Sequence, residues 1–386
     1  NCVLNGYQGA LMAPTEILAG QHYISLTESL KDFGINVGLL IGSLTKNQKD
    51  TVLEQIKNNE IDILIGTHAL IEDKVEFNNI GLVITDEQHR FGVMQRSKLS
   101  LKGANPDILV MTATPIPRTL ALILYGDLDI SIIDELPPGR QPIETIAIEK
   151  SKRDRAYNNL VRREVESGRQ VYIVCPLVEE SEAIEAKSAV ELVEELRAEY
   201  FHDLRLGLLH GKMKSSEKDE VMRLFKNKEI DILVSTTVIE VGVNVPNATL
   251  MIIENAERFG LAQLHQLRGR VGRGSHKSYC VLIYDSKTDV CRQRMAIMEE
   301  TNDGFKISEK DLEIRGPGEF FGTRQHGLPE LKVANLFKHI KILKLAQQEA
   351  RYILGEDNNL QLKENMALKK EIIDKFKDTL KEISLN

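Results

Sequence analysis

The sequence predicts an α/β protein with two tandem lobes, each a parallel sheet with flanking helices, followed by a helical C-terminal segment. Three observations support this fold class. A strand-helix-strand unit occurs twice, further short apolar runs are typical of buried parallel strands, and the strand pattern ends near Arg294. The chain has 386 residues, 42% of them hydrophobic, so it can bury the cores of two or three domains.

The repeat relates residues 38–67 to residues 207–236 at a constant offset of 169 residues, with 15 identical positions among the 30 aligned. Each copy predicts a strand, an amphipathic helix and a second strand. The predicted ranges are 37–41, 45–57 and 62–65 in the first copy, and 206–209, 215–226 and 231–234 in the second. The chain therefore contains one βαβ unit twice, which indicates duplicated lobes.

The remaining elements follow from the same kind of pattern. Further buried strands are predicted at residues 10–13, 82–85, 108–111, 171–174, 250–253 and 279–283. Residues 135–142 contain three prolines and a glycine, which favour an extended linker. A glycine-rich stretch, 304–327, leads to amphipathic helices at 334–354 and 367–383. We expect lobe 1 at residues 1–138, lobe 2 at 139–294 and the C-terminal segment at 295–386.

Composition limits the class of partner and the cellular compartment. The net charge of -7 and the sequence pI of about 5.8 give no surface-wide footprint for nucleic acid, so any DNA contact must be local. The four cysteines are scattered, which argues against a zinc site or a disulfide framework. The sequence has no long apolar run and no signal-peptide pattern, so we expect a soluble, cytoplasmic protein without a membrane partner.

Asp86 and Glu87 follow the apolar run 82–85, at the carboxyl end of a predicted parallel strand, where such sheets bind ligands. An Asp there can hold Mg²⁺, and a Glu beside it can orient or deprotonate a water that attacks a γ-phosphate. The simpler interpretation is a solvated acidic pair. In lobe 2 the equivalent strand ends in Glu254-Asn255-Ala256 without this pair, which favours one hydrolytic lobe and a nucleotide site between the lobes.

Arg268, Arg270 and Arg273 place three guanidiniums within six residues, too close for three ordinary surface ion pairs. Guanidiniums suit bidentate stabilisation of phosphoryl oxygens. Residues three apart on a helix share a face, so Arg270 and Arg273 are candidate arginine fingers that reach one ligand. A basic helix that contacts DNA phosphates is the alternative.

Polar residues also stand at other predicted strand ends: Pro14 with Thr15, the run Gly66-Thr67-His68, and Thr112 with Thr114. Backbone N–H groups and hydroxyls in such places can bind phosphate oxygens, or relay hydrogen bonds between a nucleotide and a polynucleotide. Each of these segments, taken alone, is equally typical of a helix cap.

Taken in order, these segments resemble the motif series of superfamily 2 helicases. Residues 13–16, 66–68, 86–89 and 112–114 match motifs Ia, Ib, II and III, and residues 235–244 and 266–273 match motifs V and VI. The resemblance covers nearly the entire chain. It implies that the lobes are tandem RecA-like P-loop NTPase lobes.

Residues 112–120 and 312–325 are similar to those of the RecG-type DNA helicases within this superfamily. Transcription-repair coupling translocases are the alternative, although residues 86–90 and 124–128 look more like the RecG type. The resemblance implies an ATP-dependent helicase with Mg²⁺ that remodels branched double-stranded DNA, such as stalled replication forks and Holliday junctions, in recombination and repair. We expect a bacterial, monomeric protein, with single-strand-binding protein as a candidate partner.

The resemblance also implies roles for individual residues. The catalytic residues it implies are Asp86, Glu87, Gln88, His89, Arg270 and Arg273. The residues implied to bind nucleotide are Asp86, through Mg²⁺, and Gly242, Asn244, Gln266, Arg270 and Arg273. Those implied to contact DNA or to couple it to the nucleotide are Pro14, Thr15, Gly66, Thr67, His68, Thr112, Thr114, Thr236, Thr237, Arg315, Arg324 and Gln325. Residues 304–325 would form a helical hairpin and loop, for which a hairpin that only covers lobe 2 is the simpler alternative.

Two departures from the family pattern matter. No G-x-x-x-x-G-K-[ST] loop occurs, although it should precede Ala13, and the family's N-terminal wedge domain is also absent. The chain as written is therefore expected to lack the phosphate cradle and to be ATPase-deficient alone. Asn244 stands where the family usually has Asp, so this acceptor is neutral. The alternatives to a motor fragment are an ATPase-dead DNA-binding protein and an unrelated small-substrate enzyme.

Overall fold

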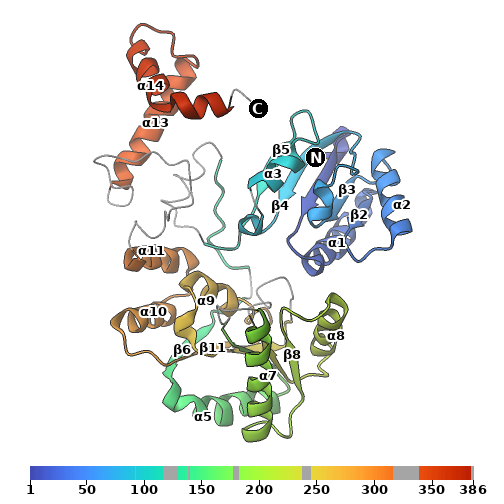
Figure 1. Cartoon of the computed structure of the whole chain (residues 1–386), viewed down its shortest axis with the longest axis vertical. Helices are drawn as coiled ribbons and strands as arrows, with labels where there is room; N and C mark the ends of the chain where they lie inside the picture. The colour runs from blue at the N-terminus through green and yellow to red at the C-terminus, as the bar shows by residue number, and fades with distance from the viewer. Residues whose placement is uncertain are drawn as a thin grey trace. The chain divides into compact units, whose positions relative to one another are not determined.

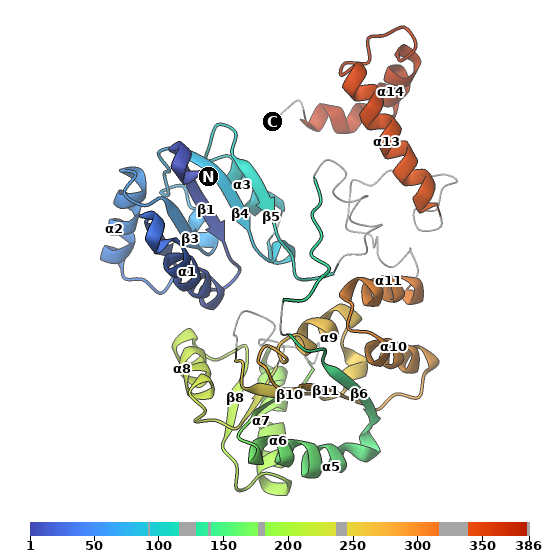
Figure 2. The same cartoon turned by 180° about the vertical axis from the view of Figure 1, so that it is seen from behind.

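The computed structural model describes residues 1–91, 93–115, 129–137, 140–176, 182–236, 245–315 and 339–383. Two parallel sheets with flanking helices are present, followed by C-terminal helices, which confirms the predicted fold class (Figures 1 and 2). The described residues fall into two compact units. One holds both sheets, and the other holds residues 129–131 with the C-terminal helices. No helix among the described residues combines the length and hydrophobicity needed to cross a membrane.

The first sheet has five parallel strands in the order β2-β3-β1-β4-β5. Its strands are β1 (Gln8–Met12), β2 (Val37–Leu40), β3 (Ile63–Gly66), β4 (Ile80–Thr85) and β5 (Asp107–Val110). The accompanying α-helices are α1 (Glu16–Leu30), α2 (Lys46–Lys57) and α3 (Val93–Ser100). Short 3-10 helices are η1 (Val3–Asn5), η2 (Lys31–Phe33), η3 (His68–Ile71) and η4 (Gln88–Arg90).

Strand β1 is buried on both faces because its residues alternate between two apolar clusters. Ala10 and Met12 pack in the cluster that contains Ile56 of α2 and Leu99 of α3. Leu11 and its neighbour Ala13 pack in the cluster that contains Ala19 of α1. Helix α1 therefore covers one face of the sheet, and α2 and α3 cover the other. This explains why the apolar run at 10–13 reads as continuous rather than alternating.

The second sheet has six parallel strands in the order β6-β11-β10-β7-β9-β8. Its strands are β6 (Glu144–Glu149), β7 (Gln170–Val174), β8 (Leu206–Leu209), β9 (Ile232–Ser235), β10 (Ala248–Ile253) and β11 (Tyr279–Tyr284). Its helical segments are η5 (Lys150–Lys152), α5 (Arg153–Arg155), the π-helix η6 (Ala156–Val161), α6 (Arg162–Glu166), α7 (Glu182–Glu199), α8 (Ser215–Lys226), η8 (Ala256–Arg258), α9 (Leu261–Arg268), α10 (Asp289–Glu300) and α11 (Gly304–Arg315).

The helices of lobe 2 also divide between the two faces of its sheet. The segment 153–166 and α7 pack on one face, and α8, α9, α10 and α11 pack on the other. Ile307 of α11 is fully buried in the core of this second face. Helix α10 runs through residue 294 without a break. The predicted domain boundaries after residues 138 and 294 remain predictions, and we propose that lobe 2 extends to the end of α11.

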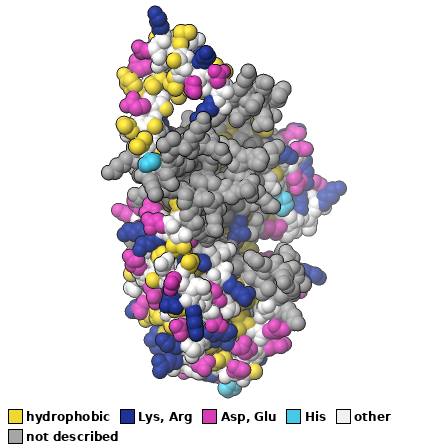
Figure 3. Space-filling view, turned by 60° about the vertical axis from the view of Figure 1, so that its left-hand side comes forward, with side chains coloured by type: hydrophobic (Ala, Val, Ile, Leu, Met, Phe, Trp, Pro, Cys, Tyr) yellow, Lys and Arg dark blue, Asp and Glu magenta, His cyan; other side chains and the backbone are white. Residues whose placement is uncertain are grey.

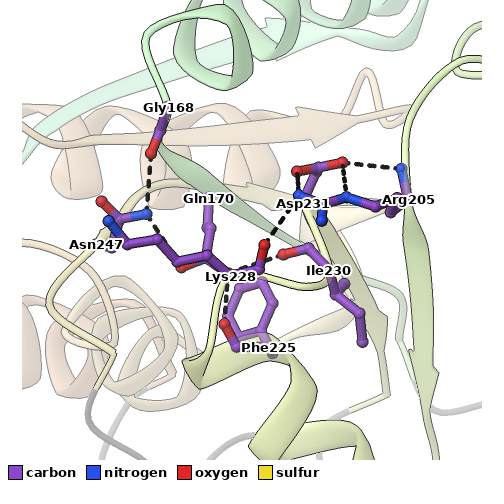
Figure 4. Close-up of polar contacts among 8 residues, drawn as sticks. All are labelled: Gly168, Gln170, Arg205, Phe225, Lys228, Ile230, Asp231 and Asn247. Atoms are coloured by element: carbon purple, nitrogen blue, oxygen red, sulfur yellow. Dashed lines mark hydrogen bonds and ion pairs between the residues drawn. The ribbon is translucent and has the colours of Figure 1, made fainter.

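The internal repeat is reproduced in the hydrogen bonding of the two lobes. Gln8 Nε2 donates to the carbonyls of Ile56 and Ile61, at 2.8 and 2.9 Å. In lobe 2, Gln170 Nε2 donates to the carbonyls of Phe225 and Ile230, at 2.5 and 2.8 Å, as Figure 4 shows. These four acceptors are related by the same offset of 169 residues. Each buried glutamine therefore fastens a central strand to the end of the βαβ helix.

A second pair of contacts repeats at the start of the following strand. Asp62 accepts a hydrogen bond from the backbone N–H of Asn36 at 2.7 Å, and Asp231 accepts one from the N–H of Arg205 at 2.9 Å (Figure 4). In lobe 2, the Arg205 side chain adds two hydrogen bonds to the same carboxylate. The predicted βαβ units are thereby confirmed in both lobes.

Strand β6 was not predicted, although it completes the second sheet. Its sequence, Glu144–Glu149, has only three consecutive apolar residues between polar ends, and the strand lies half-buried at the sheet edge beside β11. The prediction searched for continuous apolar runs, which mark strands buried on both faces. In the first sheet the corresponding position beside β5 has no strand among the described residues. Ile108 and Leu109 of β5 are exposed there, whereas the matching strand β11 is buried.

The C-terminal helices are α13 (Ile340–Glu356) and α14 (Met366–Ile383), close to the predicted ranges. Exposed apolar side chains lie on both helices, at Ile342, Leu345, Tyr352 and Met366. Yellow, hydrophobic side chains are visible over these helices at the top of Figure 3. On the rest of the coloured surface seen there, Lys and Arg are interspersed with Asp and Glu.

Candidate functional site

The acidic pair lies at the carboxyl end of β4, as predicted. The Asp86 N–H donates to the carbonyl of Met12 at 2.9 Å, which extends the pairing of β4 with β1 by one residue. The Asp86 Oδ1 atom accepts the N–H of Glu87 at 2.8 Å. Glu87 has a φ of 49°, in the left-handed region that costs a non-glycine residue free energy. The backbone turns sharply there and places both carboxylates at the sheet edge.

His22 of α1 contacts the second oxygen of Asp86. The distance from His22 Nε2 to Asp86 Oδ2 is 2.8 Å, and the side chains are 27% and 18% exposed. No Lys or Arg among the described residues forms an ion pair with Asp86. Sequence reasoning missed His22 because nothing in a helix at residues 16–30 points to a carboxylate 64 residues further along the chain.

Glu87 connects the acidic pair to the segment at the end of β5. Its Oε2 atom accepts the N–H of Ala113 at 3.2 Å. On either side of Ala113, the hydroxyls of Thr112 and Thr114 lie 2.7 Å apart and share a hydrogen bond. The Gln88 N–H donates to the carbonyl of Met111 at 3.1 Å. The residues predicted from motifs II and III therefore form one hydrogen-bonded network in lobe 1.

Lobe 2 repeats this strand end with different chemistry. Glu254 follows β10 and donates its N–H to Val174 at 2.8 Å, and Asn255 adopts a φ of 47°, so the backbone matches that of Asp86 and Glu87. The Glu254 carboxylate accepts hydrogen bonds from Arg153 Nε, at 2.8 Å, and from the Tyr157 hydroxyl. A permanent cation thus neutralises the only carboxylate at this position.

Buried hydroxyls without partners occur at matching places in the two lobes. Thr67 follows β3 and Thr236 follows β9, and the two are related by the repeat offset. Both side chains are buried, and neither Oγ1 atom has a hydrogen-bond partner among the described residues. An unsatisfied buried hydroxyl costs about 1–3 kcal/mol, so a ligand that accepts or donates there would recover free energy.

The other residues predicted to contact DNA in lobe 1 lie near the same sheet edge. Thr15 caps α1 by accepting the N–H of Leu18 at 3.3 Å, and Pro14 precedes it. His68 is exposed in the first turn of η3. Gly66 approaches β2 so closely that a Cβ atom would lie 2.3 Å from the Leu40 carbonyl oxygen. Glycine is therefore required there for packing, whatever its contact with DNA.

The interpretation of Arg270 and Arg273 as two residues on one helix face is wrong. Helix α9 ends at Arg268 because Gly269 caps it, and Gly272 has a φ of 73°. Arg270 is nevertheless buried, and Arg273 and Arg140 both donate to the Gly269 carbonyl, at 3.2 and 3.4 Å. Burial and the charges of Arg270 and Arg140 lower the pKa of Arg273 to about 10. Crowded guanidiniums of this kind favour an anionic ligand.

Arg268 points into the core of lobe 2 instead of toward a ligand. The residue is 2% exposed, and its guanidinium donates to the carbonyls of Met298 and Thr301, at 2.8 and 3.0 Å, and to the Thr145 hydroxyl at 3.1 Å. It therefore binds the C-terminal end of α10, where backbone carbonyls lack helical partners. Its grouping with the two candidate finger arginines is therefore wrong, because its guanidinium is bound within the core of lobe 2.

Replacing Arg268 with Ala is expected to lower the free energy of unfolding by about 2–5 kcal/mol, because the buried carbonyls of α10 lose their donors and a cavity forms. Urea unfolding followed by circular dichroism measures the change. The exposed Arg258→Ala variant is the matched control and should unfold within about 0.5 kcal/mol of the unsubstituted chain. Equal stability of the two variants would refute the structural role.

Of the remaining predicted site residues, only Gln266 is described together with its side chain. Gln266 lies in the last turn of α9 and is half-buried. The following lie outside the described residues: Thr237, Gly242, Asn244, Arg324 and Gln325. The side chains of His89 and Arg315 are likewise outside the description, although their backbones belong to η4 and α11.

Comparison with known proteins agrees with this arrangement. Residues 2–123 match the DEAD/DEAH box helicase family, residues 151–275 match the Helicase conserved C-terminal domain, and residues 301–384 match ATP-dependent DNA helicase RecG, domain 3, C-terminal. The chain is 54% identical over 355 residues to the ATP-dependent DNA helicase RecG of Bacillus subtilis (strain 168), covering 92% of this chain and 52% of that protein.

Two further relatives have the same name. The ATP-dependent DNA helicase RecG of Synechocystis is 54% identical over 364 residues, covering 94% of this chain and 44% of that protein. A solved structure of RecG bound to a three-way DNA junction superposes with a TM-score of 0.69 and 50% identity, covering 88% of this chain and 44% of that chain. The chain spans about half the length of the curated relatives it matches.

The two sheets and the residues at their carboxyl edges define a superfamily 2 helicase core. The three matches then extend this assignment from residue 2 to residue 384, and the last of them is specific to one family. The chain belongs to the RecG-type ATP-dependent DNA helicases. The match over residues 301–384 favours this family over the transcription-repair coupling translocases.

The residues of lobe 1 fit a divalent cation, and those of lobe 2 do not. Asp86 offers a half-buried carboxylate whose charge no Lys or Arg among the described residues neutralises. Glu254 offers a carboxylate at the matching place, but Arg153 already occupies it. Hard cations such as Mg²⁺ prefer oxygen ligands that keep their negative charge. The sequence, in contrast, contains no phosphate loop to hold the β- and γ-phosphates.

Proposed function

We propose that this chain is the motor part of a helicase that uses ATP and Mg²⁺ to remodel branched double-stranded DNA. The relative of known structure binds a three-way DNA junction, which supports branched DNA as the substrate class. The B. subtilis and Synechocystis relatives are named ATP-dependent DNA helicases, which supports ATP as the fuel. Alone, the chain is proposed to bind DNA and to hydrolyse ATP poorly, because its sequence lacks the phosphate loop.

The described residues would divide the work as follows. Asp86 would hold Mg²⁺, which supplies charge stabilisation for the transferred phosphoryl group. Glu87 would orient the attacking water and accept its proton, and its hydrogen bond with Ala113 ties it to the threonines that follow β5. Arg270 and Arg273 would stabilise the charge that develops on phosphoryl oxygens. Thr67 and Thr236 would bind phosphate oxygens of the DNA backbone.

One observation carries this proposal above the others. The duplicated lobes keep matched buried hydroxyls at Thr67 and Thr236. Among the described residues, however, Asp86 of lobe 1 forms no ion pair with a Lys or Arg, whereas Glu254 of lobe 2 is paired with Arg153. A polynucleotide is a repeating ligand, so equivalent contacts on two lobes suit it. A single hydrolytic centre suits one nucleotide for each motor. A translocating motor requires equivalent DNA contacts on its two lobes and one site of ATP hydrolysis.

The variants Thr67→Val and Thr236→Val are each expected to have a free energy of unfolding about 1 kcal/mol higher than that of the unsubstituted chain, because each removes an unsatisfied buried hydroxyl. They should also weaken binding of this chain to a three-way DNA junction about 10-fold for each hydroxyl lost. Fluorescence anisotropy with labelled junction DNA and urea unfolding measure the two effects. The salt dependence of binding should not change, because no charge is removed.

Thr249→Val is the matched control for these two variants. Thr249 is also buried, but its hydroxyl donates to Glu164 Oε2 at 2.6 Å. Its loss should destabilise the fold by about 1–3 kcal/mol and leave DNA affinity unchanged. If Thr67→Val and Thr236→Val behave like this control, the two hydroxyls are structural and the proposed DNA contact is wrong.

Hydrolysis can be tested in a restored chain, which we define as this chain joined to the part of the B. subtilis relative outside the matched region. By resemblance, that part carries the phosphate loop and the wedge domain. The restored chain should hydrolyse ATP only with Mg²⁺, and branched DNA should stimulate it. This chain alone is the control and should show no stimulated hydrolysis. Stimulated hydrolysis by this chain alone would contradict the proposed division of the site.

A further inference from the structure

His22 is the one described side chain outside the acidic segment that contacts the carboxylate of Asp86. It lies seven residues after Thr15, so it is two turns along α1 and on the same side of that helix. Ala19, one turn before it, is fully buried in the core between α1 and the sheet, with Leu18 and Tyr23 packed against that core. The ring is thus held by a helix that packing fixes to the sheet.

Both oxygens of Asp86 are engaged by donors that carry no fixed charge. Oδ2 lies 2.8 Å from His22 Nε2, and Oδ1 accepts the N–H of Glu87 at 2.8 Å. Because a carboxylate is an acceptor, the His22 ring donates its Nε2–H to Asp86. Two donors from two directions fix the orientation of the carboxylate. This is the arrangement by which outer hydrogen bonds orient metal ligands.

The repeat provides an internal comparison. Glu254, at the matching place in lobe 2, is held by Arg153 and Tyr157. Arg153 also pairs with Glu195, so its guanidinium is fixed between two carboxylates. A guanidinium is always charged and neutralises its partner, whereas an imidazole donates a hydrogen bond without a fixed charge. The nature of this partner therefore separates the lobe that can take a cation from the lobe that cannot.

Helix α1 also connects His22 to a candidate DNA contact. Thr15 caps the helix at the carboxyl edge of the sheet, and Glu16 accepts the N–H of Ser43 at 3.1 Å. We propose that His22 is a positioning residue: it orients the Asp86 carboxylate for Mg²⁺ and links it, through α1, to DNA bound at Thr15. The inference rests on the proposed function, because it assigns the cation site and the DNA contact to one helix.

The contact itself can be tested in this chain without nucleotide. Proton-nitrogen correlation spectra of ¹⁵N-histidine-labelled protein should show one ring with a protected Nε2 proton. The His22→Gln spectrum assigns that signal to His22, and in Asp86→Ala it should disappear. If the His22 ring lacks a protected Nε2 proton, or keeps it in Asp86→Ala, the inference is overturned.

The positioning role can be tested in the restored chain with Mn²⁺ and a non-hydrolysable ATP analogue. His22→Ala should reduce the gain in nucleotide affinity on adding Mn²⁺ about 10-fold. Junction DNA should also no longer alter that affinity, although DNA affinity itself stays unchanged. His22→Gln places an amide N–H where Nε2 lies and should restore both effects. His22→Asn is the matched control, because its shorter side chain reaches only the position of Nδ1 and should not restore them.

The outcomes separate the inference from the proposed function. If the unsubstituted restored chain shows no Mn²⁺-dependent nucleotide binding, the proposed function fails and the inference fails with it. If that binding is present and His22→Ala leaves it unchanged, only the inference is overturned. Equal behaviour of the Gln and Asn variants would also overturn it, because a merely space-filling role does not distinguish the position of one nitrogen.

Discussion

Replacing Glu87 with Gln in the restored chain is expected to lower DNA-stimulated ATP hydrolysis at least about 100-fold, because Gln cannot accept the proton of the attacking water. The amide keeps the size of the side chain and an oxygen that can accept the N–H of Ala113. Nucleotide and DNA affinity should therefore remain close to those of the unsubstituted chain. Steady-state hydrolysis and anisotropy measurements give the two quantities.

Asn255 provides the control for this substitution. It occupies the position in lobe 2 that corresponds to Glu87, with nearly the same backbone angles. Changing Asn255 to Asp restores an acid at that position without restoring a free carboxylate beside it, since Glu254 stays paired with Arg153. Hydrolysis should not change. A normal rate of DNA-stimulated ATP hydrolysis in Glu87→Gln would contradict the assignment of Glu87 as the general base.

Replacing Arg273 with Ala is expected to lower turnover about 1,000-fold with a smaller effect on nucleotide affinity, because an arginine finger acts mainly on charge that develops during phosphoryl transfer. Burial, Arg270 and Arg140 lower the pKa of Arg273 to about 10, so the guanidinium still carries its charge at neutral pH. Single-turnover hydrolysis measures the chemical step, and nucleotide titration measures affinity.

Arg273→Lys is the informative companion variant. Lysine keeps the positive charge but loses the planar, bidentate geometry. It should recover only a small part of the rate if Arg273 contacts a phosphoryl group. If Arg273→Ala instead lowers DNA affinity and the salt dependence of binding, while hydrolysis stays normal, the alternative of a DNA-phosphate contact is correct.

The sequence predicted the βαβ unit of each lobe because the hydrophobic periodicity and the internal repeat both indicated it. The βαβ elements at 37–66 and 206–235 lie within one residue of their predicted ends. Strand β6 was missed because this edge strand is half-buried and has only three consecutive apolar residues. Its identity depends on pairing with β11, a contact that no local pattern records.

The sequence predicted the site residues that directly follow a strand. It mispredicted those whose position depends on tertiary contacts. Asp86 and Glu87 were placed correctly because a carboxylate pair after an apolar run marks the carboxyl edge of a parallel sheet. Arg268 was grouped with its neighbours, yet α10 draws it into the core. Arg140 was considered only as part of a linker, although it meets Arg273 at the Gly269 carbonyl.

Thr67 and Thr236 show a different limit. The sequence alone left Thr67 as either a helix cap or a ligand contact, and Thr236 was assigned only through the resemblance. The fold resolves this, because neither hydroxyl has a partner among the described residues. An offset of 169 residues could have raised the question earlier, since the same hydroxyl is retained at the same place in both copies.

ATP-dependent strand displacement from a three-way DNA junction by the restored chain tests the central proposal most directly. The proposal predicts displacement that requires ATP and Mg²⁺, and that Glu87→Gln, Arg273→Ala and the double variant Thr67→Val with Thr236→Val each reduce. Displacement at the unsubstituted rate by the Glu87→Gln variant, or none by a restored chain that hydrolyses ATP normally, would contradict the proposal that these two lobes form the motor.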